Sequence, residues 1–383
     1  MNRAWAGDKP PPYSPSGPLP EGKMKVLFVY QHLILGGCES VLRARVEGLL
    51  AHGVLARAWF LNDGAGRRLF AGWEDFLSVG PLERLCRFVE RADLDLVSVL
   101  DTDEALPTLG RVFPGPLVVE VHSSYEARLE GLRSLDRARI AAFLAPSRHQ
   151  AERVRERIGP EASLFAVPNP LSAEFTDAPT PPSEPRQGPV IAWIGRLDEN
   201  KNWTELINIA RLLSTQHERV RFWIAGREGD PRVGDELYER LQQERLLERF
   251  RWFRGVDRKR LVKLLDAVRD SGGAILSTSR RESFGMTIAE ALARGCAVVV
   301  PDRPPLSALV RHQDTGLCYR PEDPADGAEQ LSALLTDASL RLRLAAAGRE
   351  RVLAAHAPGP SITALFEVLE RIGKTTTPRP GSP

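Results

Sequence analysis

The sequence has few cysteines and almost no net charge, and each shortage argues against a class of protein. Cys38, Cys86, Cys296 and Cys318 lie far apart without a C-x-x-C pair, which argues against a structural zinc site and a disulfide framework. Unpaired thiols suit a reducing compartment, so we expect a cytoplasmic location. The 52 basic and 50 acidic side chains leave a net charge of +2, whereas a duplex nucleic-acid binder normally shows a basic excess. We therefore expect no nucleic-acid partner.

Long apolar runs are also missing. No run approaches the ~20 residues that span a bilayer, and the N-terminus lacks the charged-then-apolar pattern of a secretory signal. A peripheral contact with the inner face of a membrane stays open through basic residues on predicted helices. The candidates for it are Arg43, Arg45, Arg133, Arg137 and Arg139.

Short apolar runs of strand length alternate with amphipathic helical segments along most of the chain, which predicts parallel sheets covered on both faces. The strand-length runs are 25–30, 54–61, 94–100, 117–121 and 140–145 in the first half, and 190–194, 220–225, 251–253, 273–276 and 297–300 in the second. A length of 383 residues suits two such α/β domains. The fold class predicted is therefore two Rossmann-like, doubly wound domains.

Proline-rich segments divide the chain. Residues 177–188 read DAPTPPSEPRQG, which neither a helix nor a strand tolerates, and the first 22 residues are rich in Pro, Gly and Ser. The predicted organisation is a disordered leader (1–22), an N-terminal acceptor-side domain (23–176), a linker (177–188), a C-terminal nucleotide-sugar-binding domain (189–355), a last helix packing back on the N-terminal domain (356–373) and a disordered tail (374–383).

Segment 277–291 carries the strongest chemical signal. A predicted strand ends in a polar loop that holds Glu282, and Gly285 precedes a helix that holds Glu290. Backbone N–H groups around 284–286, at a helix N-terminus, suit an anion such as a diphosphate. Carboxylates beside them can accept hydrogen bonds from sugar and ribose hydroxyls. By spacing alone, a loop acid and a helix-face acid explain the pattern equally well.

The motifs together resemble the family-4 retaining glycosyltransferases of the GT-B fold, or glycosyl transferases group 1. E-S-F-G-x-x-x-x-E-A at 282–291 resembles that family's E-x7-E signature. Four further segments fall in the family's order, and they are Gly36-Gly37-Cys38-Glu39, Val167–Pro170, Trp193–Lys201 and Thr315–Tyr319. The resemblance covers about residues 24–355. It implies two domains that face each other across a deep cleft.

The resemblance also implies roles for single residues. Arg196 and Lys201 are expected to neutralise charge on the leaving nucleoside diphosphate. Glu282 is assigned to the sugar hydroxyls and Glu290 to the ribose. His122, at a predicted strand end, is assigned to positioning the donor sugar or the incoming hydroxyl, with a buried structural histidine as the alternative. The predicted catalytic residues are His122, Glu282, Arg196 and Lys201.

A nucleoside-diphosphate sugar is the expected co-substrate, with no cofactor and no metal site. Gly226-Arg227 and Gly255-Val256 are expected beside the nucleobase, mainly through backbone groups, and Gly36-Gly37 beside the phosphate. The predicted donor-binding residues are Gly36, Gly37, Arg196, Lys201, Gly226, Arg227, Gly255, Val256, Glu282, Ser283, Phe284, Gly285, Met286 and Glu290.

The predicted function is retaining, metal-independent transfer of a sugar to an acceptor hydroxyl, in glycan, glycolipid or glycoconjugate biosynthesis. The acceptor stays open between a glycan, a lipid-linked precursor, a protein and a small molecule. A sugar-nucleotide epimerase and a catalytically silent nucleotide-sugar-binding subunit remain as alternatives. Asp101-Thr102-Asp103 has the D-x-D spacing of metal-dependent, single-domain transferases, whereas residues 31–40 lack the G-x-G-x-x-G of an NAD-dependent dehydrogenase.

Overall fold

The computed structural model describes residues 24–178 and 188–375, which fall into two compact units. The N-terminal unit lies within Met1–Ala173 and Pro358–Pro383, and the C-terminal unit is Glu174–Ala357. The predicted leader and most of the predicted linker lie outside the described residues. The short helix α6 (Ala173–Thr176) stands at the boundary, so that residues 174–176 group with the C-terminal unit and not with the first.

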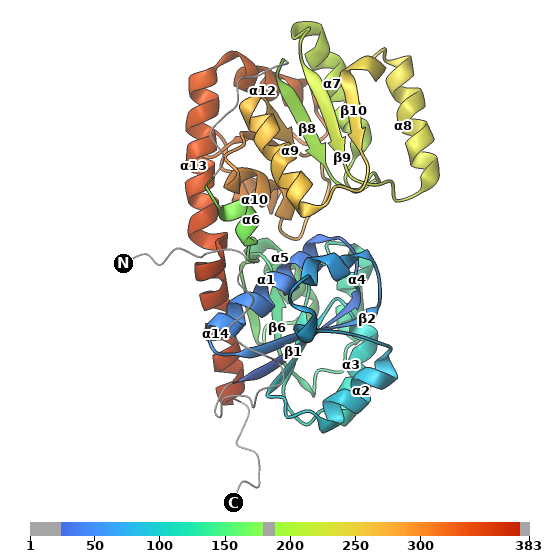
Figure 1. Cartoon of the computed structure of the whole chain (residues 1–383), viewed down its shortest axis with the longest axis vertical. Coiled ribbons are helices and arrows are strands. Elements are labelled where there is room, and N and C mark those ends of the chain that lie inside the picture. The colour runs from blue at the N-terminus through green and yellow to red at the C-terminus, as the bar shows by residue number, and fades with distance from the viewer. Residues whose placement is uncertain (1–23, 179–187, 376–383) are drawn as a thin grey trace, which may run out of the picture. The chain divides into compact units, whose positions relative to one another are not determined.

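The N-terminal unit has a seven-stranded, fully parallel sheet in the order β3-β2-β1-β4-β5-β6-β7. Figure 1 shows its strands and helices in chain order. The strands are β1 (Lys25–His32), β2 (Leu55–Asn62), β3 (Leu77–Val79), β4 (Leu96–Leu100), β5 (Leu117–Glu120), β6 (Ile140–Ala145) and β7 (Leu164–Ala166). The helices are α1 (Gly37–Ala51), α2 (Leu82–Arg91), α3 (Leu106–Val112), α4 (Glu126–Gly131), α5 (Arg148–Ile158) and α14 (Pro358–Thr375).

Both faces of this sheet are covered, because alternate residues of a strand point to opposite sides. On β1, Val26 and Phe28 belong to the buried cluster that includes residues of α1 and α14. Leu27 and Val29, between them, belong to the cluster formed with α2, α3 and α5. Near-continuous apolar strands are typical of such doubly covered parallel sheets.

Helix α14 returns to the N-terminal unit after the chain has formed the other one. Its Ile362, Leu365 and Leu369 are buried in the cluster with α1. Gly48 of α1 permits this contact, because a Cβ there would come within 2.4 Å of Ile362 Cγ1. Ser361 Oγ donates to the Pro168 carbonyl at 2.6 Å. The last helix therefore completes the core of the N-terminal unit.

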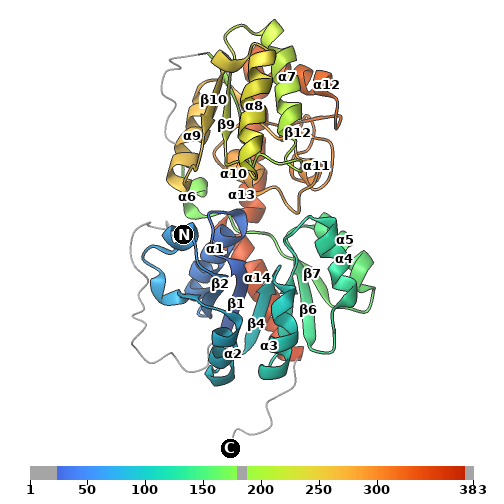
Figure 2. The ribbon, with the colours of Figure 1, turned by 90° about the vertical axis from the view of Figure 1, so that its right-hand side faces the viewer.

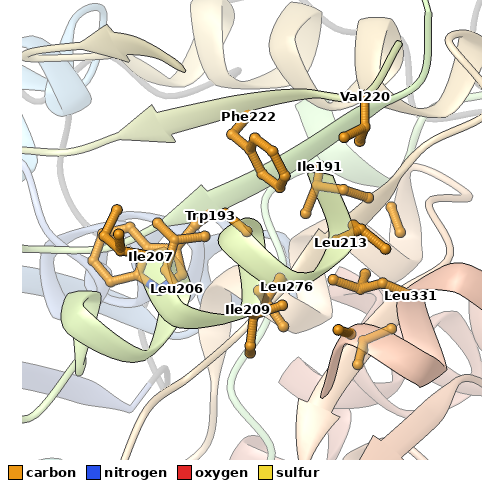
Figure 3. Close-up of a cluster of buried hydrophobic side chains, with 14 of the residues drawn as sticks. Ile191, Trp193, Leu206, Ile207, Ile209, Leu213, Val220, Phe222, Leu276 and Leu331 are labelled. Atoms are coloured by element: carbon orange, nitrogen blue, oxygen red, sulfur yellow. The ribbon is translucent and has the colours of Figure 1, made fainter. Parts of the chain in front are cut away.

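The C-terminal unit has a six-stranded parallel sheet in the order β10-β9-β8-β11-β12-β13, with helices on both sides (Figure 2). The strands are β8 (Val190–Ile194), β9 (Arg221–Ala225), β10 (Phe250–Phe253), β11 (Ala274–Leu276), β12 (Val298–Pro301) and β13 (Leu317–Tyr319). The helices are α7 (Trp203–Gln216), α8 (Pro231–Gln243), α9 (Arg258–Asp270), α10 (Met286–Ala293), α11 (Leu306–Leu309), α12 (Pro324–Thr336) and α13 (Ala338–His356). Figure 3 shows one apolar layer of its core, in which Ile191 and Trp193 of β8 pack against α7.

The predicted fold class is confirmed, since each unit is a parallel sheet between helices. Three strands were not predicted, namely β3, β7 and β13, and each has only three residues. The predicted tail starts too early, because α14 continues through Thr375. Lys374 pairs there with Glu370 at 3.4 Å, an i,i+4 contact that favours the helix.

One helical stretch of the described residues, Ala338–Lys374, is long and apolar enough to cross a membrane by length and composition, with 33% of its most apolar window buried. It consists of α13 and α14, which separate at Ala357, where ψ is 153°. Val352 of α13 is buried in the C-terminal unit and Leu369 of α14 in the N-terminal unit. The core helix of a soluble protein passes the same test of length and composition, so a single such stretch is weak evidence for a membrane span.

Candidate active site

The strand order of the C-terminal unit reverses between β8 and β11, and ligands of doubly wound sheets bind at the carboxyl ends of the strands at such a point. Two loops leave these strand ends, residues 195–202 after β8 and residues 277–285 after β11. We call them the donor loops. They contain Arg196, Lys201 and Glu282, so the sheet itself brings three of the four predicted catalytic residues to one edge.

Lys201 and Glu282 contact each other directly. Lys201 Nζ lies 2.5 Å from Glu282 Oε1, with 24% and 17% of the two side chains exposed. Arg196 is more open, and its Nε pairs with Asp198 Oδ2 at 2.6 Å. Asp198 also accepts the Lys201 backbone N–H at 2.8 Å. Two carboxylates and two cations therefore stand in two neighbouring ion pairs, with enough exposure to exchange partners for a ligand.

Hydrogen bonds connect the two donor loops. The Thr278 hydroxyl lies 2.8 Å from the Lys201 carbonyl and 2.9 Å from the Asn202 carbonyl, and it accepts the Trp193 indole N–H at 2.9 Å. Asn200 accepts the Arg280 N–H at its carbonyl and donates its side-chain amide to the Arg281 carbonyl. These hydrogen bonds fix the backbone on both sides of the Lys201–Glu282 pair.

Replacing Thr278 with valine is expected to lower the free energy of unfolding by about 1–3 kcal/mol, because the indole N–H and the two carbonyls lose a buried partner. Thr278→Ser keeps the hydroxyl and is expected to stay within about 1 kcal/mol of wild type. Urea denaturation followed by tryptophan fluorescence measures both. Equal stability of the valine and serine variants would show that the hydroxyl contributes nothing.

Helix α10 starts where the sequence predicted. Its N-cap residue, Gly285, has φ +99°, a conformation that favours glycine, and a Cβ there would have to displace Leu306 Cδ2, which would lie 2.5 Å away. No side chain caps this helix start. The Phe284 ring is buried against His356, with centroids 4.6 Å apart, so Phe284 can offer a ligand only its backbone. Ser283 and Met286, on either side, are partly exposed.

Glu290 lies on α10 and is almost fully buried. Arg258, the first residue of α9, places Nη1 3.5 Å from Glu290 Oε1 and stacks its guanidinium 4.7 Å from the centre of the Phe175 ring. Burial raises the pKa of Glu290, while Arg258 opposes that rise. Arg258 is not among the predicted site residues, and no local pattern marks it, because only the tertiary structure brings α9 to α10.

The loops predicted to face the nucleobase follow β9 and β10. Gly226 has φ +152°, and a Cβ there would lie 1.8 Å from the Gly195 carbonyl, so glycine lets the two loops approach. The Gly226 carbonyl already accepts the Trp252 indole N–H at 2.8 Å. Gly255 (φ +65°), Val256 and Arg227 remain exposed or partly exposed.

In the N-terminal unit, Gly36 and Gly37 stand at the start of α1. A Cβ on Gly36 would lie 2.6 Å from Glu39 Oε2, so glycine leaves room for this carboxylate. Glu39 is 1% exposed, and its Oε1 accepts the Ile34 N–H at 3.2 Å. The side chain of Glu39 therefore shapes the loop between β1 and α1 from within.

Glu39 makes the stability of the fold depend on pH. Burial raises its pKa from 4.5 to about 7, only partly opposed by backbone hydrogen bonds. A carboxyl whose folded pKa lies above its unfolded value stabilises the fold below pH 4.5, and that contribution is lost as the pH rises to about 7. The loss amounts to about 3 kcal/mol. Between pH 4.5 and 8, wild type should lose that much more unfolding free energy than Glu39→Gln, and parallel curves would contradict this.

His122 lies two residues after the end of β5 and belongs to a buried polar cluster. Its Nε2 lies 3.1 Å from Glu120 Oε2, which also accepts Arg45 Nη1 at 2.5 Å. Arg45 is 1% exposed, so the expectation that it lies on a basic surface was wrong. The signal was present, because Arg45 lies four residues after Val41 and four before Leu49, on the apolar face of α1.

The remaining basic residues proposed for a membrane face mostly bind the protein itself. Arg139 donates to the Phe113 carbonyl at 2.6 Å, and Arg137 donates to the Ile158 carbonyl. Arg43 pairs with Glu47 at 2.7 Å, and Arg133 with Glu130 at 2.7 Å. These contacts give the arginines a structural use.

The D-x-D triplet is also engaged. Asp101 is partly buried, and its Oδ1 accepts the backbone N–H groups of His122 and Ser123 at 3.0 and 3.1 Å. Asp103 lies 3.5 Å from Arg128. Within residues 24–178 and 188–375, no group of three or more His, Cys, Asp or Glu side chains could hold a metal ion.

Comparison with known proteins finds a family model that matches the C-terminal unit. Residues 175–351, nearly all of it, match the family model of the glycosyl transferases group 1. The match includes both donor loops and α10, and it thus covers Arg196, Lys201, Glu282 and Glu290 in the family's own segment.

Relatives extend the likeness to the N-terminal unit. The phosphatidyl-myo-inositol mannosyltransferase of Mycobacterium leprae is 28% identical over 280 residues, 70% of this chain and 71% of that protein. The D-inositol 3-phosphate glycosyltransferase of Corynebacterium efficiens is 32% identical over 170 residues, 42% of this chain and 38% of that protein. The crystal structure of Anabaena HepE in complex with UDP and glucose superposes with a TM-score of 0.80 at 19% identity, covering 91% of this chain and 100% of HepE. The fold of this chain is that of GT-B glycosyltransferases.

Proposed function

We propose that the protein is a retaining glycosyltransferase that moves a sugar from a nucleoside-diphosphate sugar to an acceptor hydroxyl. The observation that carries the proposal is the Lys201–Glu282 pair at the switch point of the C-terminal sheet. A cation that can reach a diphosphate stands beside a carboxylate that can accept sugar hydroxyls. Sugar transfer needs both, because negative charge builds on the leaving group while the sugar must stay oriented.

The diphosphate has a second source of stabilisation in this unit. Arg196 lies in the same donor loop as Lys201, and the uncapped start of α10 directs its backbone N–H groups to the same strand edge. Binding would require Lys201 to share or leave Glu282, and Arg258 to share Glu290 with the ribose. Each exchange replaces one charge-assisted contact with another, which offsets part of the cost of opening the pairs.

The acceptor is proposed to be a polyol or glycan hydroxyl, free or lipid-linked. Two relatives are named for phosphatidyl-myo-inositol and D-inositol 3-phosphate, which both contain a cyclic polyol esterified with phosphate. We assign the acceptor to the N-terminal unit, where His122 follows β5. A cytoplasmic location, with peripheral membrane contact if the acceptor is lipid-linked, is part of the proposal.

Metal independence is supported by how the aspartates are used. Asp101 accepts two backbone N–H groups and Asp103 faces Arg128, so the D-x-D triplet stabilises the β4 and β5 strand ends. The cations of the donor loops would neutralise the diphosphate in place of a metal ion. Activity is therefore expected to survive EDTA.

The test is incubation of the full chain with UDP- and GDP-hexoses and with inositol, inositol phosphate, phosphatidylinositol and oligosaccharide acceptors. Mass spectrometry should detect a glycoside together with free nucleoside diphosphate. Proton NMR of this glycoside should show the same anomeric configuration as that of the donor sugar. An inverted anomer would refute retention. Interconversion of the donor sugar without transfer would favour the epimerase alternative, and donor binding without turnover the silent subunit.

A further inference from the structure

The N-terminal unit holds a charged cluster that the donor chemistry does not use. Glu120 is fully buried, and its Oε1 accepts the Ser98 hydroxyl at 2.6 Å while its Oε2 accepts Arg45 Nη1 at 2.5 Å. Replacing such a buried ion pair with apolar side chains is often neutral or stabilising. The pair therefore calls for a reason other than stability, and the third group on Glu120 is His122.

The protonation of the cluster follows from its geometry. Burial would raise the pKa of Glu120, but Arg45 and His122 outweigh it and lower that pKa to about 2. An ionised carboxylate only accepts hydrogen bonds, so His122 Nε2, 3.1 Å away, must donate. In the neutral ring the proton then sits on Nε2 and Nδ1 is an acceptor. No residue in the described ranges 24–178 and 188–375 forms a hydrogen bond with Nδ1.

We propose that Glu120, held by Arg45, is a positioning residue that keeps the His122 proton on Nε2, so that Nδ1 accepts a hydrogen bond from a substrate hydroxyl. The inference rests on the proposed function, since sugar transfer supplies such hydroxyls. His122 follows β5 at the carboxyl edge of its sheet, where doubly wound folds bind ligands. Asp101 fixes the backbone there, accepting the His122 N–H at 3.0 Å. Backbone and ring are thus held separately.

The direct test needs neither donor nor acceptor. Nitrogen-15 NMR of the full chain with labelled histidine, near pH 8, distinguishes a protonated from an unprotonated ring nitrogen, and His122→Asn assigns the signals. The expected result is a protonated Nε2 and an unprotonated Nδ1. A proton on Nδ1 would overturn the inference. This NMR readout does not depend on turnover. A failure to find any transfer reaction would therefore refute the proposed function, and it would leave the position of the His122 ring proton to be decided by NMR.

The activity test uses Arg45→Met/Glu120→Leu, which removes both charges together and so leaves no buried charge unpaired. Turnover is expected to fall on the order of 10²-fold, with little change in donor KM. The reason is that moving a group that contacts the substrate, here the His122 ring, lowers the rate by about that factor. When the protein already carries His122→Asn, adding Arg45→Met/Glu120→Leu should cause no further loss of turnover. The control is Arg43→Met/Glu47→Leu, an ion pair of 2.7 Å on the same helix, which should leave turnover unchanged.

Two outcomes would overturn the positioning role. One is wild-type turnover in a folded Arg45→Met/Glu120→Leu protein. The other is an equal loss with and without His122, which would mean that the cluster acts on the fold and not through the ring. Melting temperatures of wild type, of Arg45→Met/Glu120→Leu, of His122→Asn and of their combination show whether a loss of turnover comes from a lower folded fraction or from a lower rate per folded molecule.

Discussion

Lys201→Ala and Glu282→Ala are each expected to lower kcat on the order of 10²–10³-fold, the usual loss when one charge-stabilising group is removed from a transition state. Lys201 would lose its contact with the diphosphate, and Glu282 its contacts with the sugar. Because the two side chains lie 2.5 Å apart, the double variant should lose far less than the product of the single losses. Steady-state kinetics with the donor found in the screen measures all three.

These variants should remain folded, since the Lys201–Glu282 pair is partly exposed and such pairs contribute about 0–1 kcal/mol. Arg240→Ala is the matched control. It removes a cation of the same unit that pairs with Glu244 at 3.0 Å on α8. Control and wild type should turn over alike. Loss of kcat in the control, or normal activity in both alanine variants, would remove the site assignment.

Arg45→Met is expected to lower the free energy of unfolding by about 3–5 kcal/mol, because it leaves the Glu120 carboxylate buried without its counter-charge. Arg45→Met/Glu120→Leu should recover most of that loss. Arg43→Met is the control, since its partner Glu47 is 42% exposed, and it should cost about 1 kcal/mol or less. Urea denaturation gives all three values. If Arg45→Met lost no more unfolding free energy than Arg43→Met, the buried Glu120 carboxylate would not need Arg45 as its counter-charge.

The regular elements were largely predictable from local patterns. The bounds of β6 and β8 agree with the predicted runs 140–145 and 190–194, because both strands are continuous apolar segments, one between Arg139 and Pro146 and the other between Pro189 and Gly195. The three-residue strands β7 and β13 were missed, since such short runs carry no periodicity. Gly285 and the start of α10 were found because glycine is favoured there by a positive φ and a close neighbour.

The candidate site was predictable where its residues follow strand ends, and only there. Lys201 and Glu282 lie in loops after β8 and β11, so the parallel sheet brings them together. Arg258 lies far from Glu290 in sequence and enters through the packing of α9 on α10. Glu120, a lone acid within the apolar strand β5, was a readable signal, yet its pairing with Arg45 of α1 depends on how the helix covers the sheet.

Isothermal titration of nucleotide sugars tests the central claim most directly, namely that the C-terminal unit binds a nucleoside-diphosphate sugar through Lys201. Wild type is expected to bind at least one UDP- or GDP-hexose, Lys201→Ala to bind it at least about tenfold more weakly, and neither to bind NAD. Equal affinity of wild type and Lys201→Ala, or binding of NAD in place of every nucleotide sugar, would contradict it.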